Sequence, residues 1–250
     1  MARPGGGEAM SDVVVRVDAV LTGVVAPLGD HGKESAIGKK PVGHRVWLGE
    51  TGLDGDEQAE RKHHGGPEKA MLHYAFDHYD AWRDEWPTTS AGRTLLDACG
   101  AFGENISTLG MTESTVCVGD MYRIGGALVQ VSQPRKPCWK LNLRFSREDM
   151  SRRVQDTRRT GWYYRVLEAG EMGAGDTIER LARPHPEWTI GRLLRVLYVD
   201  RDDRAALEGM ANLDTLTASW RETATKRLAS GTIESWSSRL DTPSGQTHDA

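Results

Sequence analysis

The sequence is poor in cysteine, and its few cysteines are scattered. Only three of the 250 residues are Cys, and no two of them stand in a C-x-x-C spacing. A disulfide scaffold, a zinc ribbon and a thioredoxin-type motif are therefore excluded, and a reducing compartment is expected.

Long apolar runs are missing as well. No segment approaches the roughly 20 apolar residues that a membrane span needs. The Gly-rich residues 1–11 also lack the apolar stretch of a secretory signal. We therefore expect a cytoplasmic protein without membrane contact. Its length allows one large domain, or one with a small companion.

Net charge is low: 32 Lys and Arg stand against 36 Asp and Glu, which gives −4. This balance excludes a generally basic nucleic-acid coat, and no nucleic-acid partner is expected. The charge is nevertheless uneven, because residues 133–165 hold ten cations and three acids, a local charge of +7. Around Cys138 this clustering favours one anionic ligand, whereas a solvated helix face explains residues 144–159 as well.

Short strands and Gly-containing turns dominate most of the chain. Apolar and β-branched runs predict strands at residues 13–28, 46–48, 116–118 and 128–132. Apolar spacing predicts one helix over residues 68–86, which Pro87 ends. Because no strand–helix–strand rhythm repeats, we expect a mainly β, barrel-like domain with a few helices over residues 12–183.

The pattern becomes helical after Pro184. Thr189 is a good N-cap for a helix whose apolar residues recur every three or four positions. Helical spacing continues over residues 204–210 and 213–228. We expect a small all-α, three-helix domain over residues 184–231. The two ends of the chain, residues 1–11 and the Ser- and Thr-rich residues 232–250, are expected to be flexible or disordered.

Cys138 is the most informative position. It lies in Pro134-Arg135-Lys136-Pro137-Cys138-Trp139-Lys140-Leu141-Asn142, where two prolines stiffen the backbone and three cations stand close to the thiol. Nearby cations favour the thiolate, which is a nucleophile or a ligand for a soft metal. The alternative is an ordinary half-buried cysteine in a loop. Cys99 and Cys117 lie in helix-like and strand-like stretches and are expected to be structural.

Three other segments carry candidate binding residues. Lys33, Ser35 and Lys39 stand in a cationic loop that could hold a phosphate, although its Gly spacing is not that of a Walker loop. Asp56 ends a Gly-rich turn ahead of His63 and His64, which form no specific zinc-ligand frame. Glu104 and Asn105 stand in a turn that enters a strand, where Asn105 can both donate and accept hydrogen bonds.

Together these stretches resemble the MOSC-domain proteins of the YiiM type. The matching segments are Gly32-Lys33-Glu34-Ser35-Ala36-Ile37, Gly52-Leu53-Asp54-Gly55-Asp56, His64-Gly65-Gly66, Phe102-Gly103-Glu104-Asn105, Val118-Gly119-Asp120, Gln133-Pro134-Arg135-Lys136-Pro137-Cys138 and Gly161-Trp162-Tyr163-Tyr164-Arg165-Val166. The segment from Pro186-Glu187-Trp188-Thr189 onward is similar to the C-terminal three-helix domain of that family. The resemblance runs over about residues 13–231.

The resemblance implies a β-barrel-like MOSC domain that binds the molybdenum cofactor, with Cys138 as a ligand of the metal. It further implies reduction of N-hydroxylated compounds, such as 6-N-hydroxylaminopurine and related base analogues, as a detoxification. Electrons would come from a separate flavin or iron–sulfur protein. Pyridoxal phosphate is also associated with MOSC domains, but no lysine here stands out as a Schiff-base former. A homodimer is one possible use of the three-helix domain.

The same resemblance assigns roles to the other candidates. Arg135, Lys136 and Lys140 would offset the charge of the cofactor, with Asn142 closing their motif. Lys33, Ser35 and Lys39 would hold its phosphate. The residues that would shape the pocket or relay protons are Asp56, His64, Glu104 and Asn105. Two alternatives stay open: a carrier of the cofactor or of sulfur, with a persulfide on Cys138, and a zinc hydrolase built on the histidines.

Overall fold

A large mixed sheet forms the body of the protein in the computed structural model, which describes residues 14–29, 33–60, 65–86 and 92–243. Nine strands lie in the order β1-β14-β10-β11-β12-β8-β9-β2-β5. Their bounds are β1 Val14–Arg16, β14 Thr177–Ala182, β10 Met121–Ile124, β11 Ala127–Pro134, β12 Trp162–Glu168, β8 Met71–Ala75, β9 Ile106–Thr108, β2 Ala19–Thr22 and β5 Lys40–Pro41. Neighbours are antiparallel except β8 and β9, which are parallel.

The sheet does not close on itself within the described residues, because β1 and β5 are its two edges. Two smaller sheets accompany it: β13 (Gly170–Met172) with β6 (Val46–Gly49) and β7 (Gly52–Leu53), and β3 (Ala26–Leu28) with β4 (Lys33–Ser35). The architecture is therefore mixed α/β, and the expectation of a mainly β barrel needs correction. Helices and loops interrupt the strand sequence at several points, so consecutive strands do not form one continuous barrel wall.

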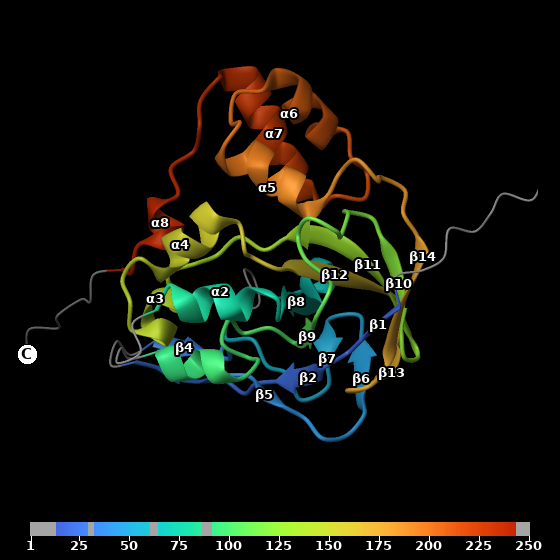
Figure 1. Cartoon of the computed structure of the whole chain (residues 1–250). Helices are drawn as coiled ribbons and strands as arrows, with labels where there is room; N and C mark the ends of the chain where they lie inside the picture. Colours follow the sequence, from blue (N-terminus) through green and yellow to red (C-terminus); the bar gives the residue numbers. More distant parts are fainter. Residues whose placement is uncertain (1–13, 30–32, 61–64, 87–91, 244–250) are drawn as a thin grey trace, which may run out of the picture.

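Three helices cover one end of this body (Figure 1). They are α2 (His78–Asp84), α3 (Lys140–Phe145) and α4 (Met150–Thr157), and two short 3-10 helices, Pro67–Lys69 and Arg93–Asp97, accompany them. Aromatic rings fill the space among them: Tyr74 and Phe102 are stacked with ring centroids 4.2 Å apart, and Phe145 lies tilted against Phe102 at 5.1 Å. This aromatic cluster anchors the helices against one end of the sheet.

The helix expected over residues 68–86 is wrong for most of its length. Residues 67–69 form a 3-10 helix, 71–75 form the inner strand β8, and only 78–84 form a helix. All five side chains of β8 are buried, so the strand shows no alternation of apolar and polar residues. A continuous apolar run followed by a true helix looks like one longer helix from sequence alone.

Other expected strands need smaller changes. Residues 14–28 form three separate strands, β1, β2 and β3, while 46–49 and 127–134 are strands as expected. Residues 116–118 do not form the expected strand. Cys117 instead makes an isolated β-bridge with Thr189. Its neighbours bond to the start of the helical domain, with Val118 N donating to Trp188 O at 3.0 Å.

The C-terminal region is helical, as expected. Helices α5 (Ile190–Tyr198), α6 (Arg204–Ala211) and α7 (Ala218–Ser230) pack together above the sheet (Figure 1). Thr189 caps α5 by accepting a hydrogen bond from Arg192 N at 3.0 Å. A single apolar core spans sheet and helices, and it includes Val131, Leu194 and Trp220. The exact domain boundaries at residues 183 and 231 stay predictions.

The chain continues beyond α7. Composition predicts disorder from Thr232 onward, yet residues 232–243 follow a defined path back to the body of the protein and form the short helix α8 (Ser237–Leu240). The N-terminus, for which flexibility is expected over residues 1–11, and residues 244–250 lie outside the described residues. No helix in the described part of the chain is long and apolar enough to cross a membrane.

Candidate functional site

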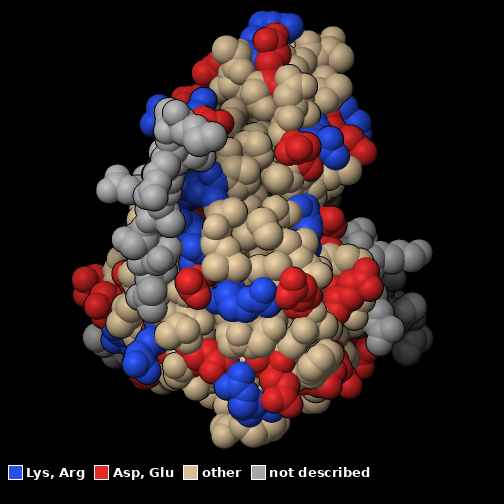
Figure 2. Space-filling view, turned by 90° about the vertical axis from the view of Figure 1, so that its right-hand side faces the viewer, with Lys and Arg blue, Asp and Glu red and all other residues tan. Residues whose placement is uncertain are grey.

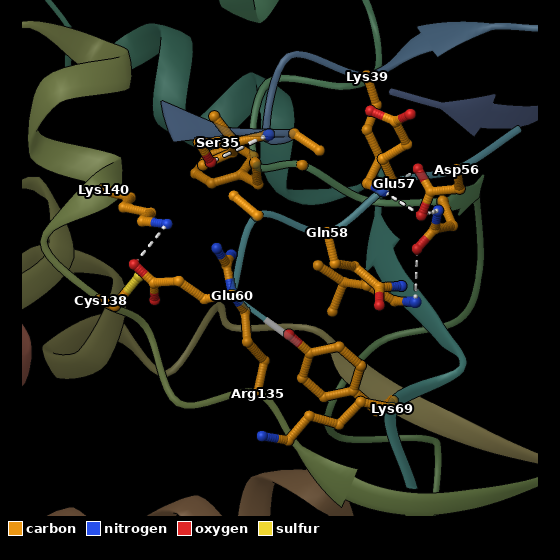
Figure 3. Close-up of a pocket in the computed structure, with 18 residues that line it drawn as sticks. Ser35, Lys39, Asp56, Glu57, Gln58, Glu60, Lys69, Arg135, Cys138 and Lys140 are labelled. Atoms are coloured by element: carbon orange, nitrogen blue, oxygen red, sulfur yellow. Dashed lines mark hydrogen bonds and ion pairs between the residues drawn. The ribbon is translucent and has the colours of Figure 1, made fainter. Parts of the chain in front are cut away.

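A pocket opens between the sheet, α3 and the loops beside them (Figure 3). Its empty volume, including the part that is open to solvent, is about 620 Å³. Its lining residues are Ser35, Ala36, Ile37, Lys39, Asp56, Glu57, Gln58, Ala59, Glu60, Lys69, Leu72, Phe102, Gly103, Asn105, Arg135, Cys138, Lys140 and Tyr163. Segments far apart in sequence therefore meet here, and several of the predicted site residues are among them.

Cys138 reaches this pocket from the turn between β11 and α3. Strand β11 ends at Pro134, and Arg135 N donates to Gly161 O at 3.0 Å, which holds the chain beside β12. Leu141 N then donates to Cys138 O at 3.0 Å as α3 begins. The thiol is half-buried at the pocket wall (Figure 3). The predicted placement of a stiff turn that presents the thiol thus agrees with the structure.

Arg135 is the most unusual cation of the pocket. The residue is only 6% exposed, and its Nη1 atom has no hydrogen-bond partner among the residues that the structure describes. Figure 3 shows its guanidinium directed into the pocket. A buried charge without a partner is costly, so such groups are normally paired with an anion. The free Nη1 atom therefore marks a position that suits an anionic group of a ligand.

Lys39 and Asp56 lie together on the opposite wall (Figure 3), and Asn105 bonds to the same carboxylate. Lys39 Nζ pairs with the Asp56 carboxylate, whose side chain is 2% exposed. The same carboxylate accepts hydrogen bonds from Asn105 Nδ2 at 2.8 Å and from Gly23 N at 2.9 Å. Burial lowers the pKa of Lys39, against the opposing effect of Asp56. The structure thus brings together three residues that the sequence suggests separately.

Lys140 and Lys69 complete the cationic side of the pocket. Lys140 Nζ lies 3.1 Å from Glu60 Oε1 and 3.2 Å from the Glu34 carbonyl oxygen. Burial lowers the pKa of Lys69. Four cationic side chains face the pocket together with three acidic ones. The site is therefore less positive than the sequence cluster alone suggests, and Arg135 stands out within it.

Four predicted site residues lie outside the pocket lining. Lys33 is exposed on β4. Glu104 is fully buried and accepts hydrogen bonds from Gly100 N at 2.6 Å and Phe102 N at 3.1 Å, so it shapes the loop that precedes Asn105. Asn142 donates to Leu240 O at 2.9 Å and accepts from Ser151 N at 2.7 Å, which are structural contacts.

Lys136 is the fourth. It points away from the pocket and lies over the ring of Trp220 in α7, 4.8 Å from its centroid. Burial, with the nearby Arg239 charge, lowers its pKa to about 8. Ser35, by contrast, does line the pocket. The prediction for His64 falls outside the described residues.

Sequence reasoning missed several lining residues. Gln58 and Glu60 lie in an irregular segment with no pattern to single them out. Lys69 ends a 3-10 helix, where the sequence predicts one long helix over residues 68–86. Tyr163 belongs to the matching segment Gly161-Trp162-Tyr163 and lines the pocket. Side chains alternate between the two faces of β12, so Tyr163 lies on the face opposite to Trp162. That alternation was the available signal.

Most of the remaining cationic segment forms ion pairs on the surface. The pairs, all at 3.0 Å or less, are Arg147–Asp149, Arg152–Asp241, Arg153–Glu85, Arg159–Glu85 and Arg165–Glu68. Figure 2 shows basic and acidic side chains interspersed on the visible face. The solvated-face interpretation thus fits these arginines, while Arg135 belongs to the pocket.

The other two cysteines lie away from the pocket. Cys117 is fully buried, its thiol donates to Pro186 O at 3.5 Å, and burial raises its pKa to about 11. Burial also raises the pKa of Cys99. The positions of both thiols outside the pocket, and their raised pKa values, are typical of structural cysteines. Among the described residues, no three His, Cys, Asp or Glu side chains gather as a metal cluster, so the zinc-hydrolase alternative gains no support there.

Comparison with known proteins agrees with this arrangement. The MOSC domain model matches residues 60–179, and the model of the YiiM-like, 3-alpha helix domain matches residues 188–231. Protein YiiM of Escherichia coli is 42% identical over 209 residues, which cover 84% of this chain and 91% of that protein. The crystal structure of YiiM from Escherichia coli superposes with a TM-score of 0.75 and 34% identity, over 91% of this chain and 99% of that chain.

A further relative carries a functional name. A protein of Gibberella moniliformis named a reductase is 43% identical over 164 residues, which are 65% of this chain and 28% of that protein. The match to the Escherichia coli protein covers 84% of this chain in sequence, and the structural match covers 91% of it. This chain therefore belongs to the YiiM family of MOSC-domain proteins.

Proposed function

We propose that the protein binds the molybdenum cofactor in this pocket and reduces N-hydroxylated compounds, such as 6-N-hydroxylaminopurine and related base analogues, as a detoxification. The observation that carries the proposal is the convergence of the Cys138 thiol and the buried Arg135 guanidinium, whose Nη1 atom lacks a hydrogen-bond partner among the described residues, on one pocket. The reductase name of the Gibberella relative supports a reductive reaction.

The pocket residues fit such a cofactor, a pterin dithiolene that carries a phosphate. A thiolate is a suitable ligand for a soft metal, and Cys138 offers one at the pocket wall. The free Nη1 atom of Arg135 would pair with an anionic oxygen of the cofactor, with Lys69 nearby. Ser35, which lines the same pocket, would contact the phosphate, whereas Lys33 is too exposed on β4 for that role and Lys39 is already paired with Asp56.

The overall reaction needs two electrons and two protons: R–NH–OH is converted to R–NH2 and water. When bound, the cofactor supplies a metal centre that can transfer an electron pair. Protein side chains do not supply electron pairs repeatedly, so the electrons would come from a separate flavin or iron–sulfur protein. What this chain must provide is a bound cofactor, an oriented substrate and a proton source.

Lys39 and Asp56 are our candidates for the proton source. The Lys39 ammonium holds a proton at Nζ directly against the Asp56 carboxylate, and both side chains line the pocket. Because burial lowers the pKa of Lys39, its proton is easier to release than that of an exposed lysine. Asn105 keeps the carboxylate oriented through its 2.8 Å hydrogen bond. Leu72 and Phe102 supply an apolar surface suited to a flat base.

A reduction assay tests the function directly. The protein is purified from cells that make the cofactor and is supplied with 6-N-hydroxylaminopurine and a chemical electron donor, which removes dependence on an unidentified partner. We expect turnover by the parent protein and loss to background in Cys138→Ala. Cys99→Ala, which removes a thiol outside the pocket lining, is the matched control and should retain activity.

Two outcomes would contradict this proposal. Cys138→Ala that keeps both the metal and the turnover would remove Cys138 from the mechanism. A cofactor-loaded parent without turnover, given a competent donor, would favour the carrier alternative. Cyanide-releasable sulfur on Cys138 would support its persulfide version.

A further inference from the structure

The segment that follows α7 connects the three-helix domain to the Cys138 turn. We call residues 232–243 the C-terminal strap. Figure 1 shows it leaving the helices, descending beside the molecule and ending in α8 next to α4. The strap lies beyond the last residue that the three-helix family model matches, residue 231. Its contacts are therefore not assigned by the family comparison.

The strap is anchored at both ends. Near its start, Glu234 Oε1 pairs with Arg227 Nη2 of α7 at 2.7 Å, and Trp236 packs edge-on against Tyr198 of α5. Near its end, Leu240 is 1% exposed. The Leu240 carbonyl oxygen accepts hydrogen bonds from Asn142 Nδ2 at 2.9 Å and Ser151 Oγ at 2.7 Å, on α3 and α4. These contacts fix the residues between them, including Arg239.

Arg239 holds both peptide groups that flank Cys138. Its guanidinium donates to the Pro137 carbonyl oxygen, on the N-terminal side of the cysteine. Its own carbonyl oxygen accepts from Trp139 N at 2.8 Å, on the C-terminal side. The second guanidinium nitrogen donates to Gln155 Oε1 of α4 at 2.6 Å, which fixes the side chain. One residue of the strap therefore brackets the cysteine.

These two peptide groups determine where the thiol points. The orientation of the Cα–Cβ bond of Cys138 follows from the planes of the peptides on either side, because each peptide unit is rigid. Functional groups need supporting contacts that hold them close to their productive geometry. From the contacts of Arg239 we infer that it is a positioning residue for Cys138, and that the strap is part of the functional site. This inference rests on the proposed role of Cys138, but the alkylation experiment that tests it first does not require that role.

Thiol alkylation measures the position of Cys138 without any cofactor. The experiment uses the full chain from cells that lack the cofactor, with Cys99→Ala to remove the other half-buried thiol, and iodoacetamide at a pH high enough to ionise Cys138 fully. Under these conditions the rate reports access to the thiol. We expect Arg239→Met to raise the rate several-fold, because the turn is released. Arg239→Lys, which can still donate to Pro137 O, should recover part of the parent rate.

Arg152→Met is the matched control. Arg152 pairs with Asp241 of the same strap at 3.0 Å, but both side chains are about half exposed and neither bonds to the cysteine turn. This variant should alkylate at the parent rate. Gln155→Met removes the other anchor of the Arg239 side chain and should raise the rate as Arg239→Met does, which guards against a misfolded first variant. Equal rates in the parent, Arg239→Met and Gln155→Met would overturn the inference.

The loaded protein supplies a second readout. If Arg239 positions the thiol, Arg239→Met should lower kcat with KM nearly unchanged. A parent protein without reductase activity, together with faster alkylation of Arg239→Met, would reject the proposed function and leave the positioning role standing. An active parent protein, together with unchanged alkylation of Arg239→Met, would support the proposed function and reject the positioning role.

Discussion

At the scale of single residues, the contrast between paired and unpaired cations is the clearest signal in the structure. The sequence shows a cluster of positive charge around Cys138, but it does not show which cations are neutralised. Lys39 is paired with Asp56 and Lys140 with Glu60, whereas Arg135 Nη1 is buried without a hydrogen-bond partner in the described part of the chain. This difference depends on side chains from distant segments, so it could not be predicted from local spacing.

Arg135 should therefore be important for binding and costly for stability. Arg135→Met removes a buried, incompletely bonded cation, and we expect the cofactor-free protein to become more stable by about 1 kcal/mol, or about 2–4 °C in Tm. The same variant should retain less molybdenum when it is purified from cells that make the cofactor.

Arg165→Met is the matched comparison. Arg165 is bonded to Glu68 Oε2 at 2.5 Å and to Gln130 Oε1 at 2.8 Å, so its removal should lower Tm and leave molybdenum content unchanged. Thermal unfolding followed by circular dichroism measures the first effect, and elemental analysis measures the second. A fall in Tm for Arg135→Met with full molybdenum content would show that Arg135 is structural.

His73 provides a residue-scale prediction about pH. It is fully buried, with Nδ1 3.0 Å from Tyr164 OH and Nε2 2.8 Å from Thr108 Oγ1. Burial lowers its pKa from 6.5 to about 3. Between these values the unfolded chain binds a proton that the folded chain does not. Its contribution to the free energy of unfolding is thus complete above pH 6.5 and falls as the pH drops towards 3, by up to about 1.4 kcal/mol per unit.

Urea unfolding at several pH values between 6.5 and 5 tests this effect. The parent should lose stability more steeply over that window than His73→Gln, which lacks the titrating ring. The comparison concerns the slope rather than the absolute stability, because the substitution also disturbs hydrogen bonds. Identical slopes in the two proteins would mean that His73 does not titrate as its burial requires.

At the scale of elements, the sequence identified those with strong local signals. Thr189 predicts the start of α5, and β-branched residues predict β6 and β11. Strand β8 was missed because it is buried on both faces, so its sequence does not alternate between apolar and polar residues. The strap was missed for a different reason: Ser-rich, polar composition predicts disorder, while its order comes from contacts with α3 and α4 through Leu240 and Arg239.

The N-cap of α5 gives a prediction at this scale. Thr189→Ala removes the acceptor for Arg192 N, bonded at 3.0 Å, and should lower the free energy of unfolding by about 1 kcal/mol. Thr223→Ala is a suitable control, because Thr223 bonds only to Ser219 O within the exposed face of α7, at 2.9 Å. Its substitution should be close to neutral, since Ala favours helix. Equal losses in the two variants would contradict the capping role.

At the scale of the whole molecule, the helical domain and the pocket are parts of one structure. The three helices share a core with the sheet, and Thr217 Oγ1 donates to Gln133 Oε1 at 2.7 Å just before the Cys138 turn. The strap then returns to that turn from the far end of α7. Sequence could predict a β-rich part, a helical part and their order, but not that the second part supports the turn of the first.

The uneven charge of the chain acquires a structural meaning at the same scale. Most cations of residues 133–165 are paired on the surface, so the cluster is not itself a binding face. The turn at its start is different, because it places Arg135 and Cys138 in the pocket. The sequence already favoured an anionic ligand around Cys138 and allowed a solvated helix face for residues 144–159, but it could not show that Arg135 faces the pocket while Lys136 lies over Trp220.

In the proposed function, the pocket around Cys138 holds the molybdenum that catalyses the reduction. The most direct measurement is elemental analysis of the parent protein and Cys138→Ala, both purified from cells that make the cofactor, together with turnover of 6-N-hydroxylaminopurine on the same samples. We expect stoichiometric molybdenum and turnover in the parent, and loss of both in the variant. A parent without molybdenum, or a Cys138→Ala protein that keeps both metal and turnover, would contradict it.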